Sequence, residues 1–144
     1  MTSSKRCRIR DLLPSLPLGA FSPGPKNSIT DIAGVTASTV TLIEPPNILT
    51  GVTAILPRKD IFRQACLAGM FRFNGNGELT GSHWIRETGL LMSPIMITNT
   101  FSVGAVSEGV LRYIDERQKN RDQTPELSLY WGLPVVVRLF HKYD

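Results

Sequence analysis

The hydrophobic residues of the chain fall into short runs that are separated by turn-forming residues. Residues 32–44 (IAGVTASTVTLIE) are crowded with β-branched side chains, which predicts a long strand that bends near Gly34 and ends at the following proline pair. Residues 51–57 (GVTAILP) predict a second strand that pairs with the first one. Residues 94–98 (PIMIT) form a continuous apolar run, which is typical of a strand covered on both faces.

Helical spacing marks two places in the second half of the chain. A long helix is predicted after residue 98, with Ser102 as its candidate N-cap. The apolar positions of this helix recur every three or four residues and are Val103, Val106, Val110, Leu111 and Ile114. A shorter helix is predicted within residues 82–91 and is closed by Gly89. A strand that leads straight into a helix favours a layered α/β domain.

A last apolar run, residues 129–140 (LYWGLPVVVRLF), predicts a further strand near the end of the chain. The pattern then holds four or five strands against one long helix. An α/β sandwich needs helices over each sheet face, and this pattern supplies few. We therefore interpret the chain as an incomplete domain whose last strand is exposed as a template for pairing.

Composition narrows the classes of function. The chain has 144 residues, of which 42% are hydrophobic and 19% charged, as in a single globular domain. Its basic residues gather at the N-terminus and in the mixed run RYIDERQKNRD, where acids and bases partly neutralise each other. A nucleic-acid partner is therefore not expected, although the net charge is +4. No apolar stretch reaches the ~20 residues of a membrane-spanning helix, so no membrane partner is expected.

The N-terminal segment and the cysteines indicate the compartment. Pro14 and Pro17 interrupt the apolar residues near the start, so no secretory signal is predicted and a cytoplasmic protein is expected. The two cysteines, Cys7 and Cys66, are too few for a disulfide scaffold. Together with only two histidines, they are also too few for a four-ligand zinc site, and no metal site is predicted.

The most unusual backbone is predicted for residues 74–81 (NGNGELTG), where three glycines and two asparagines surround Glu78. Glycine and asparagine tolerate a left-handed backbone and allow another backbone or a ligand to come close. One interpretation is a structural turn in which Glu78 caps the next segment. The other interpretation places Glu78 or an asparagine amide, Asn74 or Asn76, in the wall of a pocket.

Several segments taken together resemble the DmpA-type aminopeptidases, the family of L-aminopeptidase/D-esterase and the β-peptidyl aminopeptidases. The matching pieces follow in the order of the family and are NSITDIAGVTASTVTLIE, GVTAILPR, NGNGELTG, ETGLLMSPIMITNTFSVG and YWGLPVV. The resemblance implies part of an αββα sandwich of the DmpA/ornithine acetyltransferase type. It divides the chain into an irregular N-terminal arm (1–26), a partial α-chain-like region (27–136) and a divergent C-terminal end (137–144).

The same resemblance implies a serine aminopeptidase that releases N-terminal residues from peptides, amides or esters without a cofactor. Family precursors cut themselves and free a serine, whose new α-amino group serves as the base beside its own hydroxyl. That serine is expected beyond residue 144, so no residue here is assigned as catalytic and the chain is expected to be inactive alone. The expected partner is a peptide or an amino-acid amide or ester, and a homo-oligomer is implied; the preference for α- or β-amino acids stays open.

The resemblance also assigns substrate-binding residues. Trp131 matches a family tryptophan that lines the substrate pocket. The other candidates come from the glycine-rich stretch and are Asn74, Asn76 and Glu78. The chain departs from the family near its end, where Arg138 stands in place of an acid and Phe140 in place of a tyrosine; an arginine there would repel a cationic amino terminus. A second reading is a non-catalytic α/β module that binds a partner chain by completing its sheet.

Overall fold

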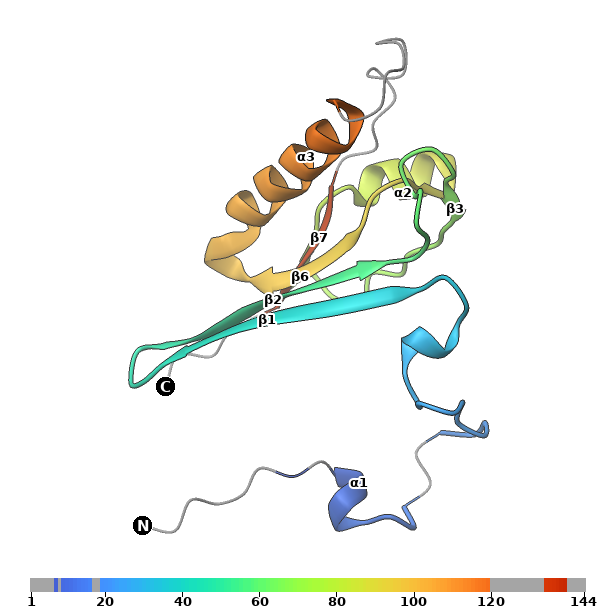
Figure 1. The fold of residues 1–144 in the computed structure, drawn as a ribbon, viewed down its shortest axis with the longest axis vertical. Coiled ribbons are helices and arrows are strands. Elements are labelled where there is room, and N and C mark those ends of the chain that lie inside the picture. The colour runs from blue at the N-terminus through green and yellow to red at the C-terminus, as the bar shows by residue number, and fades with distance from the viewer. Residues whose placement is uncertain (1–6, 8, 17–18, 120–133, 140–144) are drawn as a thin grey trace.

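The computed structural model describes residues 7, 9–16, 19–119 and 134–139. Its centre is a five-stranded sheet with the strand order β1-β2-β6-β7-β4, beside a small sheet of β3 and β5 (Figure 1). The strands are β1 (Thr36–Glu44), β2 (Ile48–Leu56), β3 (Cys66–Leu67), β4 (Glu78–Leu79), β5 (Leu90–Leu91), β6 (Ile95–Asn99) and β7 (Val135–Leu139). The helices are α1 (Ile9–Leu12), α2 (Ser82–Thr88) and α3 (Val103–Lys119), with 3-10 turns η1 (Ile29–Asp31) and η2 (Thr100–Ser102).

β1 and β2 form the antiparallel hairpin that the two β-branched runs predict. The nine residues of β1 are in unbroken register with β2, from the pair Thr36 and Leu56 to Glu44 and Ile48. β1 begins later than expected because η1 and a turn precede it, in which Gly34 has a φ of +88°. The hairpin reaches beyond the rest of the sheet (Figure 1).

A capping box holds the η1 turn in front of β1. Asp31 Oδ2 accepts a hydrogen bond from the Ser28 backbone N–H at 3.1 Å, and Oδ1 accepts one from the Lys26 N–H at 2.9 Å. The Ser28 side chain in turn accepts from the Thr30 N–H. The hydrogen bond from Ser28, opposed by some desolvation and supported by the one from Lys26, lowers the pKa of the Asp31 carboxyl.

The lowered pKa of Asp31 predicts how this turn responds to pH. We expect an NMR titration to place the Asp31 pKa below that of an aspartate in an unfolded chain. The turn is then most stable at a pH above the pKa that Asp31 has in the unfolded chain. That stabilisation disappears as the pH falls through the pKa of Asp31 in the folded protein. Asp31→Asn should keep the shape of the side chain and remove the pH dependence. An Asp31 pKa at the unfolded value would contradict the capping arrangement.

β6 and β7 form the parallel pair at the centre of the sheet and are connected through α3. β6 pairs with β2 on one side and with β7 on the other, which confirms that residues 94–98 belong to an internal strand. β7 pairs in turn with β4. The expectation of an exposed last strand is therefore wrong, because β4 pairs with β7 on the side away from β6, and the end strands of the described sheet are β1 and β4.

Both faces of β7 are covered. Val135 and Val136 are 4% and 0% exposed, although successive residues of a strand point to opposite faces. Val135 packs in a cluster with Ile85 of α2 and Leu91 of β5. α3 contacts β6 and β7, and it lies on the opposite side of these strands from α2 (Figure 1). The layered α/β arrangement predicted from the sequence is thus confirmed.

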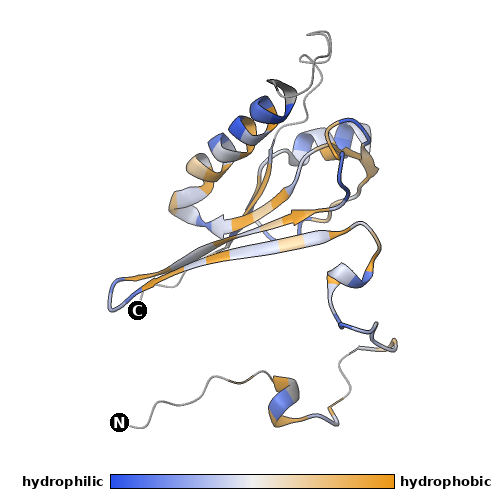
Figure 2. Cartoon of the chain, viewed as in Figure 1, coloured by the Kyte–Doolittle hydropathy of each residue, from blue (hydrophilic) through white to orange (hydrophobic). Residues whose placement is uncertain are grey.

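The apolar stripe of α3 is confirmed only in part. Val110 and Ile114, one turn apart, are 4% and 5% exposed, whereas Leu111 is 52% exposed. Hydrophilic residues dominate the C-terminal half of this helix (Figure 2). The shorter helix within residues 82–91 is confirmed as α2, with Gly89 in the left-handed conformation at its C-cap. None of the helices in the described ranges is long and apolar enough to cross a membrane.

Candidate functional site

The glycine-rich stretch 74–81 lies against β7, the last described strand along the chain. Its central residue, Glu78, is the register partner of Arg138 across the antiparallel β4–β7 pair. The Arg138 guanidinium Nη1 lies 3.8 Å from Glu78 Oε2, and the two side chains are 24% and 49% exposed. A pair this open to solvent contributes about 0–1 kcal/mol to stability. The pair also lowers the net charge at this edge of the sheet, because the carboxylate and the guanidinium cancel each other's charge.

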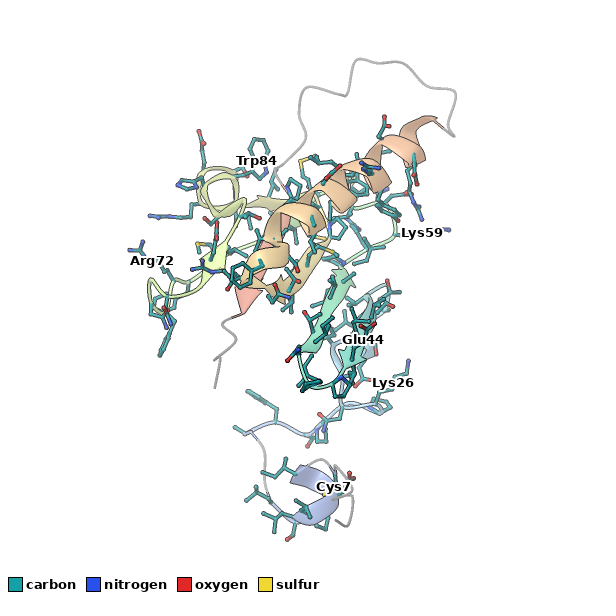
Figure 3. The ribbon with its side chains drawn as sticks, turned by 90° about the vertical axis from the view of Figure 1, so that its left-hand side faces the viewer. Cys7, Lys26, Glu44, Lys59, Arg72 and Trp84 are labelled. Carbon is teal, nitrogen blue, oxygen red and sulfur yellow. The ribbon has the colours of Figure 1, made fainter. Side chains whose placement is uncertain are left out.

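Two asparagines shape the loop that leads into Glu78. The Asn74 side-chain oxygen accepts a hydrogen bond from the Asn76 N–H at 2.9 Å, which makes the local turn that this residue type predicts. The Asn76 carbonyl then accepts a hydrogen bond from Arg138 Nη2 at 3.0 Å. Arg138 therefore binds both the loop backbone and the Glu78 carboxylate. Arg72, on the segment before Asn74, lies on the opposite side of the molecule from Lys59 (Figure 3).

The structure corrects the interpretation of Glu78 as a cap. α2 has Gly81 at its N-cap and receives no side-chain hydrogen bond there, while Glu78 faces Arg138 instead. The left-handed backbone expected of this stretch occurs at Gly81, whose φ is +72°. Gly75 and Gly77 are not left-handed, and a Cβ added at Gly77 would lie 3.8 Å from the Arg138 carbonyl oxygen, an ordinary contact.

Thr80 and Ser93 fix the start of β7, and sequence reasoning missed both. The Thr80 hydroxyl donates to the Pro134 carbonyl at 2.6 Å and accepts from the Val136 N–H at 2.8 Å. The Ser93 hydroxyl, 1% exposed, accepts from the Val135 N–H at 3.2 Å. These bonds set the register in which Arg138 meets Glu78. Threonine and serine are common residue types, so no sequence signal distinguishes these two.

We expect Thr80→Val to lower the free energy of unfolding by about 1–3 kcal/mol, since the Val136 N–H would lose its hydrogen-bond partner inside the protein. Urea denaturation of both proteins measures the difference. Thr39→Val is the matched control, because within the described part of the chain the Thr39 hydroxyl bonds only the Thr53 hydroxyl, at 3.0 Å on the exposed hairpin. Its expected cost is under about 1 kcal/mol. Equal losses in the two variants would contradict the anchoring role of Thr80.

Polar groups also gather where the parallel strands β6 and β7 end. Thr98 is the register partner of Arg138, so the next residue, Asn99, ends β6 beside this pair. The Asn99 side chain donates to the Thr50 hydroxyl at 2.5 Å and accepts from the Ser102 N–H at 3.0 Å. Asn99 therefore caps η2, the 3-10 turn that leads into α3, and the predicted N-cap Ser102 receives this hydrogen bond at its backbone N–H. In α/β sheets, ligands bind outside the carboxyl ends of parallel strands, where this group lies.

The structure brings Asn76 and Glu78 together with Arg138, while the Asn74 side chain serves the turn. Trp131 and Phe140 lie outside the described residues. β7 continues through residues 137–139, so the departure from the family pattern changes side chains without ending the strand. Arg138, which the sequence predicts would repel a cationic amino terminus, forms an ion pair with Glu78.

Comparisons with known proteins agree with the resemblance. The model of peptidase family S58 matches residues 27–140. The β-peptidyl aminopeptidase BapA of Sphingosinicella microcystinivorans is 42% identical, over 96% of this chain and 37% of the relative. A Burkholderia sp. β-aminopeptidase structure gives a TM-score of 0.78 at 41% identity, over 93% of this chain and 36% of that one. The chain thus spans little more than a third of the length of these proteins.

A second solved structure identifies the fold class. It is the L-aminopeptidase D-Ala-esterase/amidase of Ochrobactrum anthropi, described as a prototype for the serine aminopeptidases and a variant of the Ntn hydrolase fold. It matches with a TM-score of 0.71 at 36% identity, over 91% of this chain and 37% of that one. The sheet and helices described above are therefore part of such an αββα fold.

Proposed function

Since the chain belongs to peptidase family S58, we propose that it supplies one part of a self-processing serine aminopeptidase. The substrates would be peptides, amino-acid amides or esters with a free amino terminus. The catalytic serine would come from a segment outside residues 1–144, so the chain alone would have no turnover. The observation that carries this proposal is the joint match of sequence and fold to aminopeptidases over nearly the whole chain.

The proposed chemistry needs a serine hydroxyl beside an α-amino group. The amino group accepts the hydroxyl proton as the oxygen attacks the substrate carbonyl, and it then passes the proton to the leaving amine or alcohol. Water hydrolyses the ester that forms on the serine. Self-cleavage that frees the serine and its α-amino group is part of the proposal. The backbone N–H groups that stabilise the oxyanion would come from the same outside segment.

Within this chain, we assign Glu78 to the recognition of the substrate ammonium group. Glu78 is the more exposed partner of the pair, at 49% against 24% for Arg138, so a cation can approach its carboxylate from solvent. Asn76 is held beside it by Arg138. Arg138 weakens the attraction between Glu78 and the substrate ammonium group, because it cancels part of the carboxylate charge. An acid at residue 138 would instead strengthen that attraction. Trp131 keeps its proposed place in the substrate pocket.

The test is a complementation assay with aminoacyl p-nitroanilides. The purified chain should release no p-nitroaniline. Adding the remaining C-terminal segment of the Sphingosinicella microcystinivorans relative should restore release, and neither component alone should be active. An N-acetylated substrate serves as the control, since it carries no ammonium group. Turnover by the chain alone that is lost on replacing one of its own serines would contradict the proposal.

A non-catalytic module that pairs with a partner chain is the second candidate. The observation that favours it is the exposure of all nine residues of β1. A cytoplasmic location stays a prediction.

A further inference from the structure

The ion pair of Glu78 and Arg138 presents both signs of charge at one place. Glu78 Oε2 and Arg138 Nη1 are 3.8 Å apart, which is longer than a charge-assisted hydrogen bond of about 2.7–2.9 Å. These two atoms therefore attract each other without a direct hydrogen bond between them. A ligand with an ammonium group and a carboxylate on the same or on adjacent carbon atoms can contact both, with its ammonium group at Glu78 and its carboxylate at Arg138.

The fold fixes the position of both charges. Arg138 is the register partner of Glu78 on one side and of Thr98 on the other, so the three side chains form one row across β4, β7 and β6. Arg138 Nη2 donates to the Asn76 carbonyl at 3.0 Å, which orients the plane of the guanidinium. A guanidinium carries five N–H donors and binds several acceptors at once, a carboxylate among them. The pair is thus pre-organised, which lowers the entropy lost on binding a ligand.

The surroundings of the pair favour an ionic ligand. Val136, two residues before Arg138 on the same face of β7, is 0% exposed, so the pair borders the dry core. Water therefore screens the two charges less than it would on an open surface. The pair also lies where the parallel strands β6 and β7 reach their carboxyl ends, the place where α/β sheets bind ligands.

We propose that Arg138 is a specificity-determining residue, which selects substrates whose N-terminal residue carries a carboxylate beside its ammonium group. This inference rests on the proposed function, in which Glu78 receives the ammonium group. Two isomeric residues present this chemistry. An aspartyl residue linked through its α-carbonyl keeps its side-chain carboxylate, and one linked through its side-chain carbonyl keeps its α-carboxylate. An acid at residue 138 would repel either carboxylate, so arginine reverses the selection.

Kinetics of the complemented enzyme, formed from the full chain and the remaining segment of the Sphingosinicella microcystinivorans relative, test the proposal. The substrates are the α-linked and β-linked aspartyl p-nitroanilides, each compared with the same compound in which the free carboxylate is a carboxamide. The ratio of kcat/KM, acid over carboxamide, cancels the effect of Arg138 on the ammonium group, because both compounds carry that group. We expect a ratio of at least about ten for one isomer or for both, which identifies the linkage. Ratios of one or less for both isomers would overturn the proposal.

Variants at residue 138 assign the selection to its charge. Arg138→Gln should lower the ratio to about one, and Arg138→Lys, which keeps the positive charge, should give a ratio above that of the glutamine variant. Arg112→Gln is the matched control, because it removes an arginine from the ion pair with Glu108 on α3 and should leave the ratio unchanged. An unchanged ratio in Arg138→Gln, or equal ratios in its glutamine and lysine variants, would overturn the role of Arg138.

Binding to the full chain alone separates this inference from the proposed function. The probes are the two monoamides of aspartic acid, which imitate the two linkages, and its diamide, which has no carboxylate. NMR titrations that follow the amide signals of Glu78 and Arg138 should give at least one monoamide a dissociation constant at least about tenfold below that of the diamide. Equal binding of all three overturns the inference, whatever the turnover. The expected binding without turnover of any substrate in the complemented enzyme would contradict the proposed function alone.

Discussion

Ile114→Asp is expected to lower the free energy of unfolding by at least about 4 kcal/mol. Ile114 is 5% exposed, on the helix that contacts β6 and β7. The substitution removes its apolar contribution, about 2–5 kcal/mol, and it places a carboxylate where no water can solvate it. Since whole domains are stable by only about 5–15 kcal/mol, the loss is a large part of the total. Thermal unfolding followed by circular dichroism measures it.

Leu111→Asp is the matched control on the same helix. Leu111 is 52% exposed, so the same new carboxylate stays in water and the expected loss is below about 1 kcal/mol. The comparison isolates burial, because helix, side-chain type and added charge are shared. If the two variants lost similar stability, α3 would not pack on the sheet through Val110 and Ile114.

Arg138→Gln and Glu78→Gln are expected to change activity in opposite directions. The readout is kcat/KM of a chimera in which residues 27–139 replace the matching segment of the Sphingosinicella microcystinivorans relative. Arg138→Gln leaves the Glu78 carboxylate uncompensated, so kcat/KM for a substrate with a free ammonium group should rise about tenfold. Glu78→Gln should lower it by a similar factor. One unit charge about 5 Å from the ammonium group corresponds to about 1–2 kcal/mol in a partly solvated site.

A neutral ester without an amino group separates electrostatics from loss of structure. Its turnover should change little in either variant, because it presents no charge to residues 78 and 138. Since Arg138 also binds the Asn76 carbonyl, the glutamine variant must retain the thermal stability of the parent. If kcat/KM for charged and neutral substrates changed by the same factor, Glu78 would not recognise the ammonium group.

Local patterns in the sequence were sufficient to predict strands and a hairpin. They did not predict contacts that depend on the register between strands far apart in the sequence. The β-branched runs of β1 and β2 and the apolar run of β6 were sufficient to predict three strands and the hairpin. The contact of Glu78 with Arg138 was not predictable, because a two-residue strand carries no periodicity that specifies its partner. The Thr80 bond to Pro134 joins residues 54 positions apart, which no local pattern encodes. Leu111 was misplaced because the predicted stripe was wider than the contact of α3 with the sheet.

The position of β7 has a consequence for synthesis on the ribosome. β7 is the last described strand along the chain, yet it lies between β6 and β4. A nascent chain emerges N-terminus first, so β1, β2, β4 and β6 leave the exit tunnel before the strand that joins β4 to the rest. Until Val135–Leu139 emerges, the apolar residues that β7 later covers remain open to water and to other nascent chains. Chaperone binding should therefore be strongest just before Val135–Leu139 leaves the exit tunnel.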